Sequence, residues 1–152
     1  MSLPGIEPVD DFTNKEWQSW VERDQINLSG NKATARINAI SSSPDSLKPQ
    51  MVLHCNSRNS RFYINWGTEV GKAKRNNVYI DGEKFVTPRW NTSKNKLLTY
   101  YPKKVLGKVK KMLGGEIYSV EIEERGGRKI KAEFAITGIN TALDPIRYVC
   151  EW

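Results

Sequence analysis

The sequence predicts a single, mainly β domain, built as an antiparallel β-sandwich or a barrel-like sheet with two short helices. Three observations favour this fold class. The chain has 152 residues, which suits one domain. Several short segments alternate apolar and polar residues, as strands do when one face is buried and the other is solvated. Clusters of glycine, proline, asparagine and serine separate those segments, as turns do.

The chain divides into a lead-in, residues 1–14, and a β-rich domain, residues 15–152. We expect the lead-in to be flexible because it carries two prolines, a glycine and several acids without an apolar period. Met1-Ser2-Leu3 is interpreted as a cloning remnant, followed by a linker. The net charge of +7 favours anionic partners, although the lysines are scattered as on an ordinary solvated surface. No stretch approaches the roughly 20 apolar residues of a membrane-spanning helix.

The first half of the chain predicts four strands, at 17–23, 32–40, 50–55 and 61–66. The second strand alternates most cleanly, and one of its faces carries Ala33, Ala35, Ile37 and Ala39. The run from Ser41 to Asp45 is expected to end it. The third and fourth strands form a hairpin across the polar turn at 56–60.

The middle of the chain predicts a tight hairpin, an extended run and a helix. Asp81-Gly82 tolerates positive φ and therefore joins strands at 77–80 and 84–87, and 96–101 is extended. Pro102 opens the helix, which Gly114-Gly115 ends. Its apolar face holds Val105, Leu106, Val109, Met112 and Leu113, and its solvated side holds Lys103, Lys104, Lys108, Lys110 and Lys111.

The last third predicts a hairpin and a second short helix. Residues 118–122 and 130–136 alternate on either side of Gly126-Gly127, with acids on the first strand facing lysines on the second. The helix runs through Tyr148, with Asn140 or Thr141 as its cap, and buries Leu143, Ile146 and Val149.

The residues that could carry catalysis or hold a metal do not form a persuasive set. His54 is the single histidine. It is adjacent to Cys55 in a strand, so the two side chains point to opposite faces and do not make a catalytic pair. We expect His54 at the surface or in a cross-strand contact. No carboxylates pair convincingly, and no phosphate-binding loop has the required spacing. The sequence therefore predicts no enzyme, no cofactor and no metal site.

The two cysteines, Cys55 and Cys150, leave two alternatives open. In a cytoplasmic protein, an isolated pair is usually two free thiols. In an oxidising compartment they can form a disulfide, which would tie the C-terminal end of the chain to the third strand.

A small basic β domain can also bind nucleic acid, in the manner of an oligonucleotide-binding barrel. Bases would stack on Tyr63, Tyr79, Tyr100 and Tyr101, and phosphates would meet Arg58, Arg61, Lys74 and Arg75. Most of these aromatic residues fall within strand patterns that need core residues, so this cytoplasmic or phage-related module is the alternative hypothesis.

A series of ordered segments resembles the type VI secretion-associated protein family known as VasI or TagO. The resemblance covers roughly residues 17–152, and the order of the pieces makes it specific. The matching segments are Met51-Val52-Leu53-His54-Cys55, Phe62-Tyr63-Ile64-Asn65-Trp66-Gly67, Val78-Tyr79-Ile80-Asp81-Gly82, Arg89-Trp90-Asn91-Thr92-Ser93, Val109-Lys110-Lys111-Met112-Leu113, the run 132–139, the run 142–147, and Cys150-Glu151-Trp152.

The resemblance implies an exported, periplasmic accessory protein of Gram-negative bacteria without assigned catalysis. By resemblance, the two family cysteines correspond to Cys55 and Cys150 and form a disulfide. Family members begin with a signal peptide, which we take to have been removed from this chain. The helix at 103–111 is more basic than the resemblance implies, which leaves open a phage- or prophage-encoded relative.

The function predicted is therefore a non-enzymatic accessory or binding protein of the cell envelope, associated with type VI secretion. Its expected partner is an envelope or secretion-system protein or an anionic glycan. The candidate partner-binding residues are Arg89, Trp90, Tyr101, Lys103 and Lys104. Three other tryptophans, Trp17, Trp66 and Trp152, are expected in the core.

Overall fold

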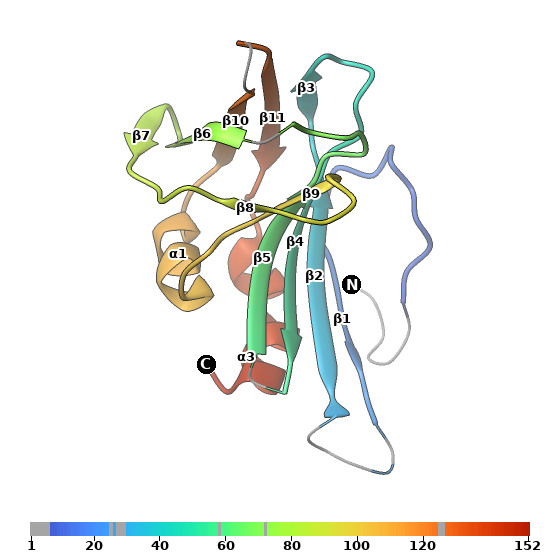
Figure 1. The fold of residues 1–152 in the computed structure, drawn as a ribbon. Helices are drawn as coiled ribbons and strands as arrows, with labels where there is room; N and C mark the ends of the chain where they lie inside the picture. The colour runs from blue at the N-terminus through green and yellow to red at the C-terminus, as the bar shows by residue number, and fades with distance from the viewer. Residues whose placement is uncertain (1–6, 25, 27–29, 58, 72, 125–126) are drawn as a thin grey trace.

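A computed structural model describes residues 7–24, 26, 30–57, 59–71, 73–124 and 127–152. It consists of two antiparallel sheets with short helices beside them (Figure 1). Inner residues of both sheets belong to one hydrophobic core. The expectation of a mainly β, sandwich-like fold is confirmed.

The six-stranded sheet has the order β1-β2-β4-β5-β9-β8, and the five-stranded sheet has the order β3-β11-β10-β6-β7. The predicted hairpins are present, because the alternating segments pair with their neighbours in the chain. The strands, in chain order, are β1 Gln18–Glu22, β2 Lys32–Asn38, β3 Ser41–Ser43, β4 Gln50–Asn56, β5 Asn59–Asn65, β6 Ala73–Ile80, β7 Glu83–Phe85, β8 Asn91–Thr92, β9 Leu98–Tyr100, β10 Ile117–Glu124 and β11 Lys129–Ala135.

Two short strands depart from the sequence prediction. The serines at 41–43 were expected to end a strand, but they form β3 and pair with β11 in the other sheet. The chain thus changes sheets after Asn38, because the backbone of β11 offers hydrogen bonds that weak strand formers can still take. The second departure is β8, which the sequence did not predict and which pairs with β9 at the edge of the six-stranded sheet.

The six-stranded sheet has two unlike faces. Cross-strand neighbours Ala35, Leu53 and Phe62 belong to the core and define the inner face. Arg36 and Tyr63 alternate with them, so they lie on the opposite face, called here the outer face. Figure 1 shows the helix at the C-terminus behind this sheet, away from the N-terminal segment.

The helix α1, Val105–Met112, begins three residues later than the prediction from Pro102, and Lys104 caps it without a side-chain hydrogen bond. Lys108, predicted to be solvated, is only 5% exposed. The prediction was wrong because Lys108 follows Val105 by three residues and precedes Met112 by four. Both spacings place it on the buried stripe of the helix.

The predicted C-terminal helix is divided into α2, Ile139–Ala142, and α3, Asp144–Cys150. The predicted cap is wrong: no side chain caps α2, and Gly138, at φ 90°, precedes it instead. The disulfide between Cys55 and Cys150 is present, with the two Cα atoms 5.9 Å apart, and it ties α3 to β4.

The core tryptophans are placed as follows. Trp66 is fully buried, as predicted, and its Nε1 donates a hydrogen bond to Thr99. Trp17 and Trp152 are partly buried and pack against the core from outside. Of the helices formed by the described residues, none is both long and apolar enough to cross a membrane.

Residues 7–14 of the predicted lead-in contact the β domain. The side chain of Asn38, on β2, donates to the backbone carbonyls of Asp11 and Asn14 at 2.8 and 2.7 Å. Arg36 reaches the carbonyl of Pro8 and the carboxylate of Asp10. We call residues 7–14 the N-terminal strap; residues 1–6 lie outside the described part of the chain.

Candidate functional site

A hollow of about 520 Å³ lies where β5, β8 and β9 meet at one edge of the six-stranded sheet. We call it the edge groove. The residues that line it come from the start of β5, the β8–β9 hairpin and the segment that leads to α1. They are Ser60, Arg61, Asn91, Thr92, Ser93, Lys94, Tyr100, Tyr101 and Pro102.

The walls of the edge groove are fixed by backbone hydrogen bonds. The Tyr101 amide donates to the carbonyl of Phe62, which holds the segment after β9 against β5. At the tip of the β8–β9 hairpin, the Ser93 amide donates to the carbonyl of Leu98, and the Leu98 amide donates to the Ser93 hydroxyl. Lys96 takes a positive φ of 62° there, which lets the chain turn tightly. The groove is therefore formed by the fold itself.

The lining of the edge groove combines three kinds of side chain. Arg61 and Lys94 are exposed cations. Hydroxyl and amide groups from Ser60, Asn91, Thr92 and Ser93 add donors and acceptors, and Tyr100 and Tyr101 add aromatic surface. A few polar groups beside aromatic surface are typical of binding sites for small molecules, and arginine binds carboxylates with paired, charge-assisted hydrogen bonds.

Next to the groove, the outer face of the sheet carries an aromatic pair. The rings of Tyr63 and Tyr100 lie 5.3 Å apart on adjacent strands. Burial raises the pKa of the Tyr63 phenol, and the neighbouring Tyr100 adds to the shift. His54, also on this face, shares a hydrogen bond of 3.1 Å with Thr34 across the strands, as predicted. Burial lowers the pKa of His54, so the imidazole is neutral at neutral pH.

Behind the groove, Lys108 lies among aromatic rings. Its Nζ atom is 4.9 Å from the ring centre of Tyr118, 5.7 Å from that of Tyr101 and 5.8 Å from that of Trp90. Burial, with a smaller contribution from Lys111, lowers the pKa of Lys108 to about 8. The Tyr118 hydroxyl is buried without a hydrogen-bond partner in the described part of the chain. This cluster pins α1 against the wall that Tyr101 shares with the groove.

The predicted partner-binding residues fall into different places. Tyr101 lines the edge groove. Lys103 and Lys104 are exposed and follow directly after the groove, and Arg89 is exposed just before β8. The prediction that Trp90 binds a partner is wrong. Trp90 is 2% exposed, its ring meets Phe62 edge-on with the ring centres 5.5 Å apart, and its Nε1 donates a hydrogen bond to Thr87. A side chain enclosed in this way has no surface to offer a partner.

The residues of the nucleic-acid hypothesis are only partly brought together. Tyr63, Tyr100 and Arg61 lie close to one another at the groove end of the outer face. Tyr79 lies on β6 in the other sheet. Arg58 and the side chains of Lys74 and Arg75 fall outside what the structure describes.

Sequence reasoning missed half of the groove. Ser60, Asn91, Thr92, Ser93 and Lys94 were not singled out. Ser60 falls in the predicted polar turn, and the other four lie in or beside β8, which is only two residues long and leaves no alternation to read. Three lining residues were named from the sequence: Arg61 and Tyr100 for nucleic acid, and Tyr101 both for nucleic acid and as a partner-binding residue.

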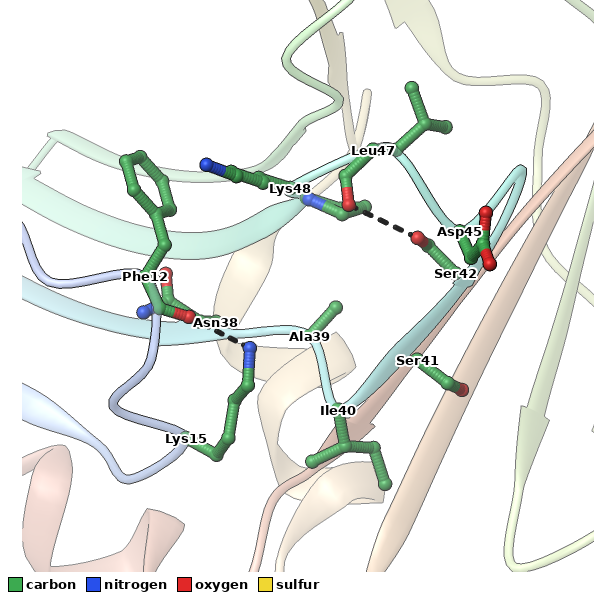
Figure 2. A pocket seen from close by; sticks show the side chains of 11 residues that line it. Phe12, Lys15, Asn38, Ala39, Ile40, Ser41, Ser42, Asp45, Leu47 and Lys48 are labelled. Atoms are coloured by element: carbon green, nitrogen blue, oxygen red, sulfur yellow. Dashed lines mark hydrogen bonds between the residues drawn. The ribbon is translucent and has the colours of Figure 1, made fainter.

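A second cavity, of about 280 Å³, lies between the N-terminal strap, the end of β2 and the segment 41–49 (Figure 2). Its cations already have partners within the protein. Lys15 Nζ donates to the carbonyl of Phe12 at 2.8 Å, and Lys48 Nζ lies 5.4 Å from the Phe12 ring centre. The Ser42 hydroxyl donates to the carbonyl of Leu47. We therefore take the edge groove as the candidate site.

Comparison of the chain with protein-family models, curated proteins and solved structures gives no match. Within the described residues, no group of three or more histidine, cysteine, aspartate and glutamate side chains is arranged to hold a metal ion.

Proposed function

We propose that this protein is a non-enzymatic binding module of the bacterial cell envelope, accessory to type VI secretion, and that its edge groove binds an anionic glycan. The observation that carries the proposal is the lining of the groove. Arg61 and Lys94 match the carboxylates of such a glycan, the hydroxyl and amide groups match its hydroxyls, and Tyr100 offers a flat surface for a sugar ring.

Two further observations support the envelope as the compartment. The disulfide between Cys55 and Cys150 is of the kind that persists in oxidising compartments such as the periplasm. The resemblance of residues 17–152 to the VasI or TagO family adds the link to secretion, with a phage-encoded relative as a variant of it. Fractionation of cells that express the natural gene tests the compartment: the protein should be periplasmic, and recovery with cytosolic markers would contradict the proposal.

The groove is tested by calorimetric titration with hexagalacturonate, an oligosaccharide of carboxylate-bearing sugars, at low salt. The double variant Arg61→Ala/Lys94→Ala should bind about tenfold or more weakly, because each cation loses a charge-assisted contact. The matched control is Lys84→Ala/Lys129→Ala, which removes the same charge from exposed positions on the five-stranded sheet.

Equal losses from the two double variants would mean that only net charge attracts the glycan, and the groove would not be the site. No binding by the wild-type protein would also overturn the proposal. A secretion-system or envelope protein, the other partner class, would then be sought at β8, since an edge strand offers unpaired backbone groups.

A second candidate function is the binding of single-stranded nucleic acid. It is supported by Tyr63 and Tyr100, which lie beside Arg61 on the outer face and could stack with bases. Titration with oligothymidylate separates the two. Affinity for nucleic acid should fall steeply with salt, and Tyr63→Ala should weaken it. Tighter binding of the oligonucleotide than of hexagalacturonate would favour this second function.

A further inference from the structure

Arg36 is a fixed cation on the outer face, one strand in from the β1 edge of the six-stranded sheet. It lies on β2, is 8% exposed as a residue, and its guanidinium carbon sits 5.2 Å from the ring centre of Trp20. Its Nε donates a hydrogen bond of 3.1 Å to the side-chain oxygen of Gln18. Stacking and this hydrogen bond orient the guanidinium before any ligand arrives, and its remaining N–H groups can serve a ligand.

In this structure a carboxylate of the chain itself binds these remaining N–H groups of Arg36. The Asp10 carboxylate lies 2.8 Å from Nη1 of Arg36, and the carbonyl of Pro8 accepts from Nη2 at 3.1 Å. The side chain of Asp10 is 64% exposed, whereas that of Arg36 is 10% exposed. The carboxylate therefore approaches a prebuilt site from the solvent side.

The N-terminal strap is attached in two separate parts. Residues 11–14 are held by Asn38, which donates to two backbone carbonyls and is itself held by a hydrogen bond from Gln50. The amide and the hydroxyl of Thr13 both donate to the Asp11 carboxylate. These bonds lower the pKa of Asp11 and hold the backbone of residues 11–13 in a turn. Residues 8–10 contact the sheet through Arg36, so this part can lift away while the Asn38 attachment stays.

Arg36 and the edge groove lie in one row of the sheet. The register places Arg36 opposite Val52, Val52 opposite Tyr63, and Tyr63 opposite Tyr100, which lines the groove. Neighbouring strands are about 4.8 Å apart, so three steps carry the row about 14 Å from Arg36 to Tyr100. A chain of several sugars can span that distance. Between the two ends of the row lies the aromatic pair of Tyr63 and Tyr100.

We infer that the outer face holds a second subsite, centred on Arg36, for a carboxylate of the same glycan, and that Asp10 occupies it in the free protein. This inference rests on the proposed function and narrows the ligand to a uronate-bearing glycan, because the group now on Arg36 is a carboxylate. A long ligand displaces residues 8–10 and bridges from the groove to Arg36. The strap is then a competitor that lowers the affinity for long glycans only.

The test compares Asp10→Ala with Glu7→Ala, a matched control that removes the same charge from the same strap. Glu7 is exposed, and no ion pair is seen for it among the described residues. In the full chain, Asp10→Ala should bind hexagalacturonate at least about threefold more tightly than Glu7→Ala, since the competitor is gone. Digalacturonate, too short to leave the groove, should bind the two variants equally. Hydrogen exchange at the amides of residues 9 and 10 of the free protein should rise in Asp10→Ala alone.

The outcomes separate the subsite from the groove. Equal hexagalacturonate affinities in Asp10→Ala and Glu7→Ala would overturn the subsite and leave the groove standing. A gain in Asp10→Ala, combined with no loss in Arg61→Ala/Lys94→Ala, would support the subsite and remove the groove. A gain of the same size for digalacturonate in Asp10→Ala over Glu7→Ala would show that a short glycan binds at Arg36 by itself, and it would overturn the bridge from the groove. Absence of any glycan binding overturns both, and preferred binding of oligothymidylate does so in favour of nucleic acid.

Discussion

The two faces of the six-stranded sheet have different roles, although the same strands form both. The inner face is part of the core, and the outer face is the proposed binding surface. On β4, the inner face carries Leu53 and Cys55, which are sealed under the other sheet and α3. The outer face carries Val52 and His54, beside cations, tyrosines and the N-terminal strap. Successive side chains of a strand point to opposite faces, so neighbouring residues of β4 serve different purposes. Leu53 and Cys55 stabilise the core, whereas Val52 and His54 lie on the proposed binding face.

The comparison also shows how differently the protein handles two enclosed cations. Arg36, on the outer face, is met by a carboxylate that solvent can reach. Lys108, on the core side, is surrounded by aromatic rings, and no ion pair is seen for it among the described residues. An exchangeable anionic partner is a property of a binding site, whereas an enclosed ammonium bears chiefly on folding stability.

The largest effect should follow from breaking the inner face at its covalent link. Cys150→Ser opens a disulfide whose cysteines are 95 residues apart, and it should lower the free energy of unfolding by about 4 kcal/mol, measured by denaturant titration. Cys55→Ser should cost a similar amount. Hexagalacturonate affinity should stay unchanged while the protein is folded, since the groove lies on other strands.

A loss below about 1 kcal/mol would contradict the assignment of stability to this link. Thiol counting in denatured, unreduced wild-type protein provides the control, and it should find no reactive thiol, because both cysteines are in the disulfide.

A smaller, pH-dependent effect should mark Lys108. Burial holds its pKa at about 8 in the folded protein, against 10.5 for an ordinary lysine. Between these values the unfolded chain holds the proton and the folded protein does not, so stability gains from this residue as pH rises. Relative to Lys108→Met, which does not titrate there, the wild-type protein should gain about 2–3 kcal/mol between pH 7 and pH 10.

Chemical denaturation at several pH values measures this difference. Lys110→Met, an exposed change on the same helix, should show no such trend against the wild type. A difference between wild type and Lys108→Met that stays constant with pH would show that Lys108 keeps its ordinary titration, and the picture of an enclosed ammonium would be wrong.

Most of the fold could be predicted because its hairpins leave local signals. Alternation marked β10 and β11, and Asp81-Gly82 marked the turn between β6 and β7, where both residues indeed take positive φ. The strands β3 and β8 could not be predicted, since three serines and two polar residues carry no period. Their pairing is set by the backbone edge they meet in the folded protein.

The candidate site was harder to predict, because its residues meet only through the tertiary fold. Tyr101 was predicted to bind a partner and does line the groove, but Trp90, predicted to do the same, is enclosed by Phe62 and Lys108. The ion pair of Asp10 with Arg36 joins a proline-rich segment to a strand, and neither pattern foretells the contact. Lys108 was predicted to be solvated, although its helical spacing from Val105 and Met112 was the signal that could have placed it on the buried stripe.

The most direct test of the account is to map hexagalacturonate onto the protein by amide chemical shifts at low salt. We expect shifts that follow one row of the outer face, from Arg61, Asn91 and Tyr100 in the groove through Tyr63 to Arg36. The amides of Val9 and Asp10 in the strap should shift only at higher ligand concentration. Shifts confined to exposed lysines of the five-stranded sheet and α1, or none at all, would contradict the claim that the outer face is the binding surface.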